Sequence, residues 1–139
     1  MVDIGLVRRK LILLENYKRE LAKLPDKNLA EFRKDFALQK AVEKMLEDMI
    51  QVCIDVAKHI IADEKMRIPD DNKGAFDVLN DNGVLSQKTS GTFKKMAGFR
   101  NILVHLYEKI DIETVYINYR RRIGDFTVFA KEIEKYLSH

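Results

Sequence analysis

The chain has 139 residues, of which 46% are hydrophobic and 34% charged, and this composition excludes a disordered or low-complexity protein. Its length is typical of one domain, and we predict a single domain over residues 1–139. The net charge of +3 permits binding to nucleic acid but does not imply it, because the basic residues would also have to cluster. The single cysteine, Cys53, excludes a disulfide framework and a thiolate zinc site.

The apolar runs are too short for a membrane span, and the longest, such as residues 11–14, cover only a few positions. The N-terminus carries Asp3 and the basic residues 8–10 before any apolar run, unlike a secretory signal. With one cysteine in the chain, these features predict a cytoplasmic protein with no membrane partner.

Apolar residues recur three or four positions apart along most of the chain, which predicts helices. The first such segment, Ile4 to Leu24, ends at a proline. Asn28, with Glu31 three residues later, is typical of an N-cap with a capping box. Asp35 is a second candidate cap, placed before a long amphipathic helix over residues 36–62.

The second half of the chain shows the same period. A short helix capped by Asp71 or Asn72 is predicted up to the Asp-Asn-Gly turn at 81–83. A third long helix is predicted from Phe93 to about Glu108, and Asp111 is a candidate cap for the next helix.

Residues 114–119 (TVYINY) are the one segment whose composition favours a strand. Their apolar side chains nevertheless follow a helical period, and no second strand is available to pair with them. We therefore predict a helix here, a bend at 120–124 and a final helix. The predicted fold is all-α, an antiparallel bundle of about five to six helices.

The sequence lacks the motifs of much enzyme chemistry. It has no glycine-rich phosphate loop and no GxSxG, HExxH or CxxC pattern. The three histidines lack partners at metal-ligand spacing, so no metal site or cofactor is expected. Cys53 and His59 are interpreted as structural and His139 as part of a frayed end. The run 120–122 is interpreted as a solvated bend, with contact to RNA or to a partner protein as the alternative.

One segment, FRNILVHLY, stands apart. On a helical wheel of this segment and the turn before it, one arc is predicted to face the core. The residues on this arc are Met96, Phe99, Ile102, Leu103, Leu106 and Tyr107. The other arc carries Arg100 and His105 at its edges, about 7.5 Å apart along the axis, with Asn101 between them. Ala97 and Gly98 are predicted to leave that face open to a ligand or a partner helix.

This set of residue types suits RNA cleavage. The reaction takes a proton from a 2′-hydroxyl, gives one to the leaving oxygen and builds charge on the phosphate. Histidine suits the proton transfers, arginine matches two phosphate oxygens, and Asn101 can orient either group. One histidine at the motif of each chain favours a symmetric dimer that brings two copies to one cleft. Spacing alone does not separate this interpretation from a structural histidine and a chance arginine.

Residues 100–107 (RNILVHLY) resemble the R-x4-H-x-Y signature of HEPN-domain toxins, and specifically the HepT-like group paired with MntA-type nucleotidyltransferase antitoxins. Residues 32–64 and 98–116 resemble the long helix and the motif helix of that group. The likeness covers nearly the whole chain.

The resemblance implies a toxin of a toxin–antitoxin pair that acts as a metal-independent endoribonuclease in a homodimer. It implies that Arg100 and His105 are catalytic, and that Tyr107 is the residue to which the antitoxin attaches AMP. Asn101 is taken as a third catalytic residue, with a hydrogen bond to the dimer partner as the alternative. A different class of function also fits the same face: a non-catalytic helical module that binds a nucleotidyltransferase or a nucleotide.

Overall fold

The computed structural model describes residues 1–139 and contains helices but no strands. The elements in chain order are α1 (Ile4–Ala22), α2 (Leu29–Arg33), α3 (Phe36–Asp63), α4 (Asn72–Asp81), α5 (Gln87–His105), the short 3₁₀ turn η1 (Tyr107–Lys109), α6 (Ile112–Arg121) and α7 (Ile123–Leu137). The all-α prediction is confirmed, with seven α-helices in place of the expected five or six.

Four of the predicted helix starts are confirmed at their caps. Asn28 accepts a hydrogen bond from the Glu31 N–H at 2.9 Å, and the Glu31 carboxylate accepts one from the Asn28 N–H at 3.1 Å, which completes the capping box. Asp35, Asp71 and Asp111 each accept a backbone N–H in the first turn of α3, α4 and α6. These side chains satisfy donors that have no partner within the helix.

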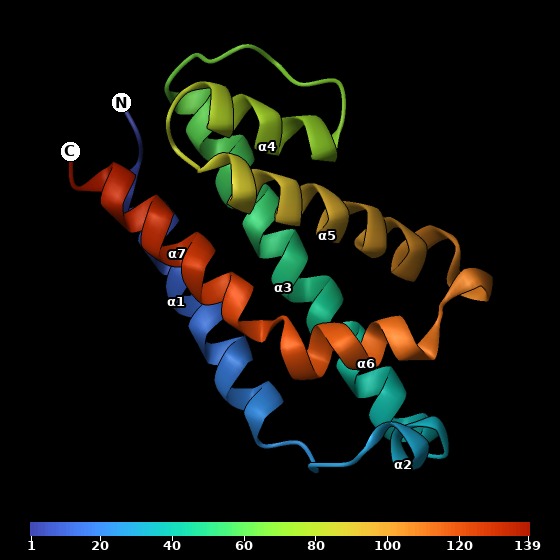
Figure 1. Ribbon diagram of the computed structural model, residues 1–139. Helices are drawn as coiled ribbons and strands as arrows, with labels where there is room; N and C mark the ends of the chain where they lie inside the picture. The colour runs from blue at the N-terminus through green and yellow to red at the C-terminus, as the bar shows by residue number, and fades with distance from the viewer.

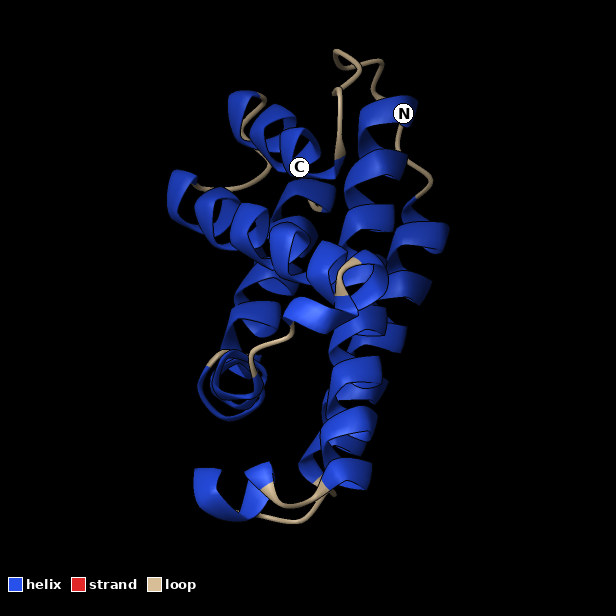
Figure 2. Cartoon of the chain, turned by 90° about the vertical axis from the view of Figure 1, so that its right-hand side faces the viewer, coloured by secondary structure: helices blue, strands red, loops and turns tan.

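Helix α3 is the axis of the bundle. It contacts α1, α2, α4, α5 and α6, and Figure 1 shows α1 and α7 on one side of it and α4 and α5 on the other. Most of its predicted apolar stripe is buried, including Val42, Leu46, Met49 and Cys53. Figure 2, turned by 90°, shows how the loops are confined to the ends of the helices.

Two aromatic clusters hold the shorter helices in place. Phe93 of α5 packs on Phe76 of α4 and on Phe126 and Phe129 of α7, with ring centroids 4.8–5.7 Å apart. At the other end of the bundle, Phe32 of α2 packs on the two tyrosines of the TVYINY segment. That segment forms α6, so the helix prediction is confirmed, and the chain bends at Arg122 before α7, as expected.

The remaining predicted structural residues have ordinary positions. Cys53 is fully buried, and burial raises the pKa of its thiol well above the usual value, so it is protonated at neutral pH. His59 is partly buried in α3, and His139 is exposed at the chain end. None of the helices combines the length and the apolar character that a bilayer crossing requires.

Candidate active site

Helix α5 carries the RNILVHLY segment, but its limits differ from those predicted. It starts at Gln87, where the Ser86 hydroxyl accepts the Thr89 N–H at 3.2 Å, and it ends at His105. The backbone leaves the helical conformation at Leu106, and the next residues form η1. Figure 1 shows this end of α5 and η1 together at the edge of the molecule, away from the crossing with α3.

The core-facing side of α5 is only in part the one that the helical wheel predicted. Phe93 and Ala97 are fully buried, and Arg100 follows them on the same line of the helix, at spacings of four and three residues. Met96 and Phe99 are also buried, as expected, whereas Ile102 and Leu103 are only partly buried. The prediction that Ala97 leaves the motif face open is therefore wrong.

The cause of this error is the approach of α4. The Ser90 hydroxyl donates to the Phe76 carbonyl at 2.9 Å, and Lys94 pairs with Asp77 at 3.0 Å, so α4 lies along the side of α5 that was expected to be free. Gly98 is covered as well, by a lysine side chain from the first turn of α4. The wheel compares apolar content around one helix and cannot show where a second helix will pack, and α4 here packs on α5 through an aromatic pair, a hydrogen bond and an ion pair.

Arg100 is partly buried at the point where the core ends. Its Nε atom is enclosed and has no hydrogen-bond partner, and its guanidinium forms no ion pair within the chain. Buried polar groups are normally hydrogen-bonded, and an exception marks a place where a water molecule, an ion or a ligand can supply the partner. Because the guanidinium forms no ion pair within the chain, its charge is available to an anion that approaches the end of α5.

Asn101 and His105 lie further around the same end of the helix. Asn101 is partly buried, and His105 is exposed as the last residue of α5. Neither side chain forms a hydrogen bond or ion pair within the chain. Arg100, Asn101 and His105 are therefore all present at one helix end without partners that would compete with a ligand.

The helical wheel placed Tyr107 on the core-facing arc of α5, and this prediction is wrong. Tyr107 begins η1 and is 68% exposed, and the neighbouring Leu106 is 47% exposed. The prediction failed because α5 stops at His105, so both residues leave the helical period on which the wheel depends. The turn is closed by the Lys109 N–H, which donates to the Leu106 carbonyl at 2.7 Å, and the Tyr107 hydroxyl is left free in solvent.

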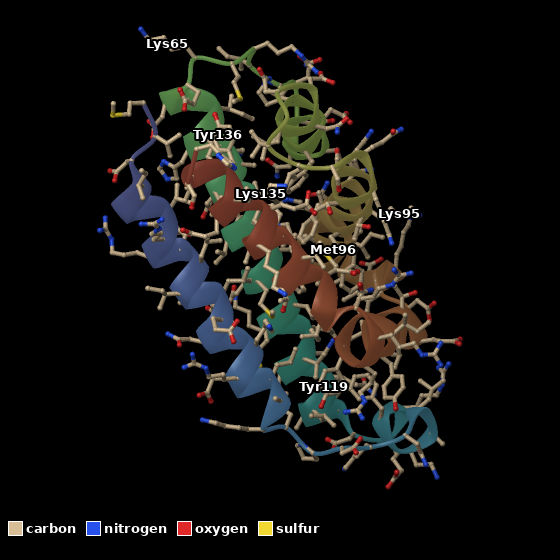
Figure 3. All side chains as sticks on the ribbon, turned by 60° about the vertical axis from the view of Figure 1, so that its left-hand side comes forward. Lys65, Lys95, Met96, Tyr119, Lys135 and Tyr136 are labelled. Atoms are coloured by element: carbon tan, nitrogen blue, oxygen red, sulfur yellow. The ribbon has the colours of Figure 1, made fainter.

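The four motif residues line none of the main cavities of the chain. A cavity of about 280 Å³ with a mixed polar and apolar lining opens between α5, α6 and α7, and its lining includes Lys95, Met96, Asn118, Arg122 and Asp125 but none of the four motif residues. Lys95 and Met96 are labelled in Figure 3, on the part of α5 that precedes the motif. The motif is thus an open surface at a helix end, which one chain does not enclose.

The arginine run does not form one basic patch. Arg120 pairs with Asp26, Arg122 lies 3.8 Å from the Asp125 carboxylate, and Arg121 is exposed. Two of the three positive charges are therefore matched by nearby carboxylates, as expected for a solvated bend. No group of three His, Cys, Asp or Glu side chains is arranged to hold a metal ion.

Comparisons with known proteins agree on the class of this chain. The family model described as ribonuclease HepT-like matches residues 13–133. A protein named mRNA nuclease HepT from Shewanella oneidensis is 33% identical over 105 residues, which cover 76% of this chain and 79% of that protein. A protein named tRNA nuclease HepT from Aphanizomenon flos-aquae is 26% identical over 136 residues, which cover 98% of this chain and 92% of that protein.

Solved structures give the same result. A tri-AMPylated HEPN toxin of Shewanella oneidensis in complex with an MNT antitoxin is 29% identical and superposes with a TM-score of 0.86 over 97% of this chain and 99% of that one. A toxin–antitoxin structure with AMP-PNP is 28% identical, with a TM-score of 0.84 over 96% and 99%. YutE of Bacillus subtilis, at 22% identity and a TM-score of 0.85 over 99% and 92%, shares the fold.

An all-helical domain with an R-x4-H-x-Y segment at the end of a helix defines this protein as a HEPN domain. Within that class, the chain belongs to the HepT-like ribonuclease family, because the family model matches most of its length. The resemblance inferred from the RNILVHLY segment is confirmed at the level of the family.

Proposed function

We propose that this protein is the toxin of a toxin–antitoxin pair and that it cleaves RNA as an endoribonuclease without a metal ion. The observation that carries the proposal is the state of Arg100, Asn101 and His105. They meet at one helix end, and no group of the chain occupies their side chains. The family match and the relatives named mRNA and tRNA nucleases support the same activity.

The residues divide the chemistry between them. Arg100 binds the scissile phosphate and stabilises the charge that builds on its oxygens. The 2′-oxygen attacks phosphorus, the bond to the 5′-oxygen breaks, and histidine accepts the proton from the first oxygen and supplies one to the second. Asn101 orients the phosphate or the imidazole. Arginine and histidine together thus supply charge stabilisation and proton transfer, which is why we infer a reaction independent of metal.

We propose that the active form is a homodimer. Each chain has one histidine at the motif, and the reaction has two proton transfers. The motif is open at the molecular edge, and the unsatisfied Arg100 Nε and the exposed Leu106 lie at the same end of α5. A second copy, related by a two-fold axis, would bring two motifs to one cleft and enclose the substrate.

We further propose that an MntA-type nucleotidyltransferase silences the protein in the cytoplasm by attaching AMP to Tyr107. The 68% exposure of this side chain makes its hydroxyl accessible to a second enzyme. An AMP group there adds negative charge two residues from His105, where it would repel the RNA backbone. The tri-AMPylated state of the Shewanella oneidensis toxin structure supports this form of control.

The test is cleavage of bulk cellular RNA by purified protein with a chelator present, after intact-mass measurement has confirmed that Tyr107 carries no AMP. We expect cleavage by the wild type and by His139→Ala, an exposed histidine outside the motif, and none by His105→Ala. Cleavage that survives in His105→Ala would contradict the site. Absence of cleavage by the unmodified wild type, together with capture of a nucleotidyltransferase, would favour the non-catalytic binding module.

A further inference from the structure

Lys73, in the first turn of α4, lies across Gly98 of α5. Its Cε and Nζ atoms are 3.1 and 3.3 Å from the point where a Cβ atom at position 98 would stand. Any residue other than glycine would therefore meet the lysine side chain at this crossing. The two residues are 25 positions apart in the sequence, and no sequence pattern connects them.

The packing of α4 against α5 holds the lysine at this place. The helices run antiparallel, with Asp77 paired to Lys94 at 3.0 Å and the Phe76 carbonyl bound by the Ser90 hydroxyl at 2.9 Å. One turn earlier in α4, this register brings Lys73 opposite Gly98. The backbone of α4 is thus fixed by two polar contacts, while the lysine itself is exposed.

Gly98 lies on the same side of α5 as two motif residues. Asn101 and His105 follow it at spacings of three and seven residues, which share one helix face. At 1.5 Å per residue, the Lys73 amino group is about 10 Å along the axis from His105. The lysine therefore extends the motif face toward the start of α5.

The charge of Lys73 is not matched within the chain. Lys73 forms no ion pair. Asp77, one turn further along the same helix, forms its ion pair with Lys94. Asp71, just before it, accepts the Gly74 N–H at 2.7 Å as the cap of α4. The ammonium is left as a free positive charge beside the motif.

We propose that Lys73 is a positioning residue that binds a phosphate of the RNA other than the one cleaved, and so aligns the strand along α5. This inference rests on the proposed RNA cleavage. The ammonium has only donors and acts as a point charge, so it suits a phosphate without base preference. At about 10 Å from the histidine, it is about three nucleotides away along a stacked strand with a rise of about 3.4 Å.

Gly98 has a role in the same contact. A methyl group at this position would displace the end of the lysine side chain, which is flexible, without forcing the backbones apart. Alanine also favours a helix more than glycine does, so Gly98→Ala is expected to fold. This variant moves the Lys73 amino group while leaving its charge in the chain.

The experiment measures binding of a fluorescent single-stranded RNA to the full chain in a His105→Ala background, which removes cleavage, over a range of salt concentrations. The Lys73→Gln variant loses one phosphate contact, so it should bind RNA about five-fold more weakly at 0.1 M salt, and its salt slope should be lower by about 0.7. Lys73→Arg should keep the affinity, and Gly98→Ala should lose part of it. Lys65→Gln, which removes an equal charge at the far end of α3 (Figure 3), should match the parent.

Equal affinity and salt slope in Lys73→Gln and the parent would overturn the assignment of Lys73 and leave the proposed cleavage intact. An equal loss in Lys65→Gln would also overturn it, because the effect would then be one of net charge. A parent that binds no RNA would remove both this inference and the proposed function. In the cleaving enzyme, Lys73→Gln should raise KM and leave kcat nearly unchanged, as positioning of substrate requires.

Discussion

Arg100 and His105 are five residues apart on α5, but only Arg100 is partly buried, and His105 is exposed. Arg100 continues the buried line of Phe93 and Ala97, and its Nε has no hydrogen-bond partner, whereas His105 is exposed in the last turn. An unsatisfied buried donor costs about 1–3 kcal/mol of stability. The arginine is thus poorly suited to the isolated fold and well suited to binding an anion.

This relationship predicts opposite effects on activity and on stability. Arg100→Met keeps an unbranched side chain but removes the buried Nε, so the free energy of unfolding should be unchanged or raised by about 1 kcal/mol. RNA cleavage should be lost, because the phosphate loses its charged partner. Urea unfolding and a cleavage assay on the same preparation check both effects. A variant that loses more than about 1 kcal/mol would show that Arg100 supports the fold through packing.

Because Tyr107 is exposed, removing its hydroxyl should prevent the attachment of AMP without changing the stability of the fold. Tyr107→Phe removes the hydroxyl from a side chain that is 68% exposed, so the free energy of unfolding should change by less than about 0.5 kcal/mol. Incubation with ATP and an MntA-type nucleotidyltransferase should add AMP to the wild type and none to this variant, as intact mass reports. The partly buried Tyr116, whose hydroxyl is bonded to the Lys27 carbonyl, gives the control variant Tyr116→Phe, which should still be modified. AMP found on Tyr107→Phe would place the acceptor elsewhere.

The aromatic cluster around Phe93 predicts a large cost of truncation. This ring is fully buried against three phenylalanines of α4 and α7, so Phe93→Ala should lower the free energy of unfolding by about 3–5 kcal/mol. Phe36 is 69% exposed at the start of α3, and Phe36→Ala should cost less than about 1 kcal/mol. Urea denaturation of the two variants tests the comparison. Equal costs would mean that the cluster does not hold α4 and α7 on α5.

The ion pair at the start of α3 predicts a dependence of stability on acid. The Lys27 ammonium donates to the Asp35 carboxylate at 2.6 Å, and this bond, with the Leu38 N–H, lowers the pKa of Asp35. Because the folded-state pKa of Asp35 is lowered, the ion pair stabilises the fold at pH values above the unfolded pKa of about 3.9. This stabilisation is lost as the pH falls through the folded-state pKa. The same bond raises the pKa of Lys27, so its contribution is lost only at strongly alkaline pH, as the pH rises through that folded value.

Thermal unfolding of Asp35→Asn across pH checks this expectation, because asparagine keeps the N-cap and removes the charge. The Tm of the variant should lie below that of the wild type at pH 7, and the difference should shrink as the pH falls below about 4. Asp70→Asn, at an exposed carboxylate outside any ion pair, should show no such difference. A gap between Asp35→Asn and wild type that is constant with pH would exclude the ion pair as its cause.

The helices and their starts follow from local features of the sequence. A capping box at Asn28 and Glu31, and aspartate caps at Asp35 and Asp111, act within one turn of the residues they cap, so a linear pattern is enough to find them. The TVYINY segment is harder, since its composition favours a strand, but helical spacing and the absence of a pairing strand identify it as α6. The RNILVHLY motif is equally local and identifies the family without coordinates.

The sequence alone was therefore sufficient for an all-helical fold, most helix starts and the residues of the motif. It was not sufficient for the surroundings of the motif, which depend on contacts between residues far apart in the chain. The wheel of α5 assumed a longer helix and an open side at Ala97, whereas the helix ends at His105 and α4 covers that side. The position of Lys73 over Gly98 and the enclosed Nε of Arg100 result from this packing, because periodicity records which residues are apolar and not which helix meets them.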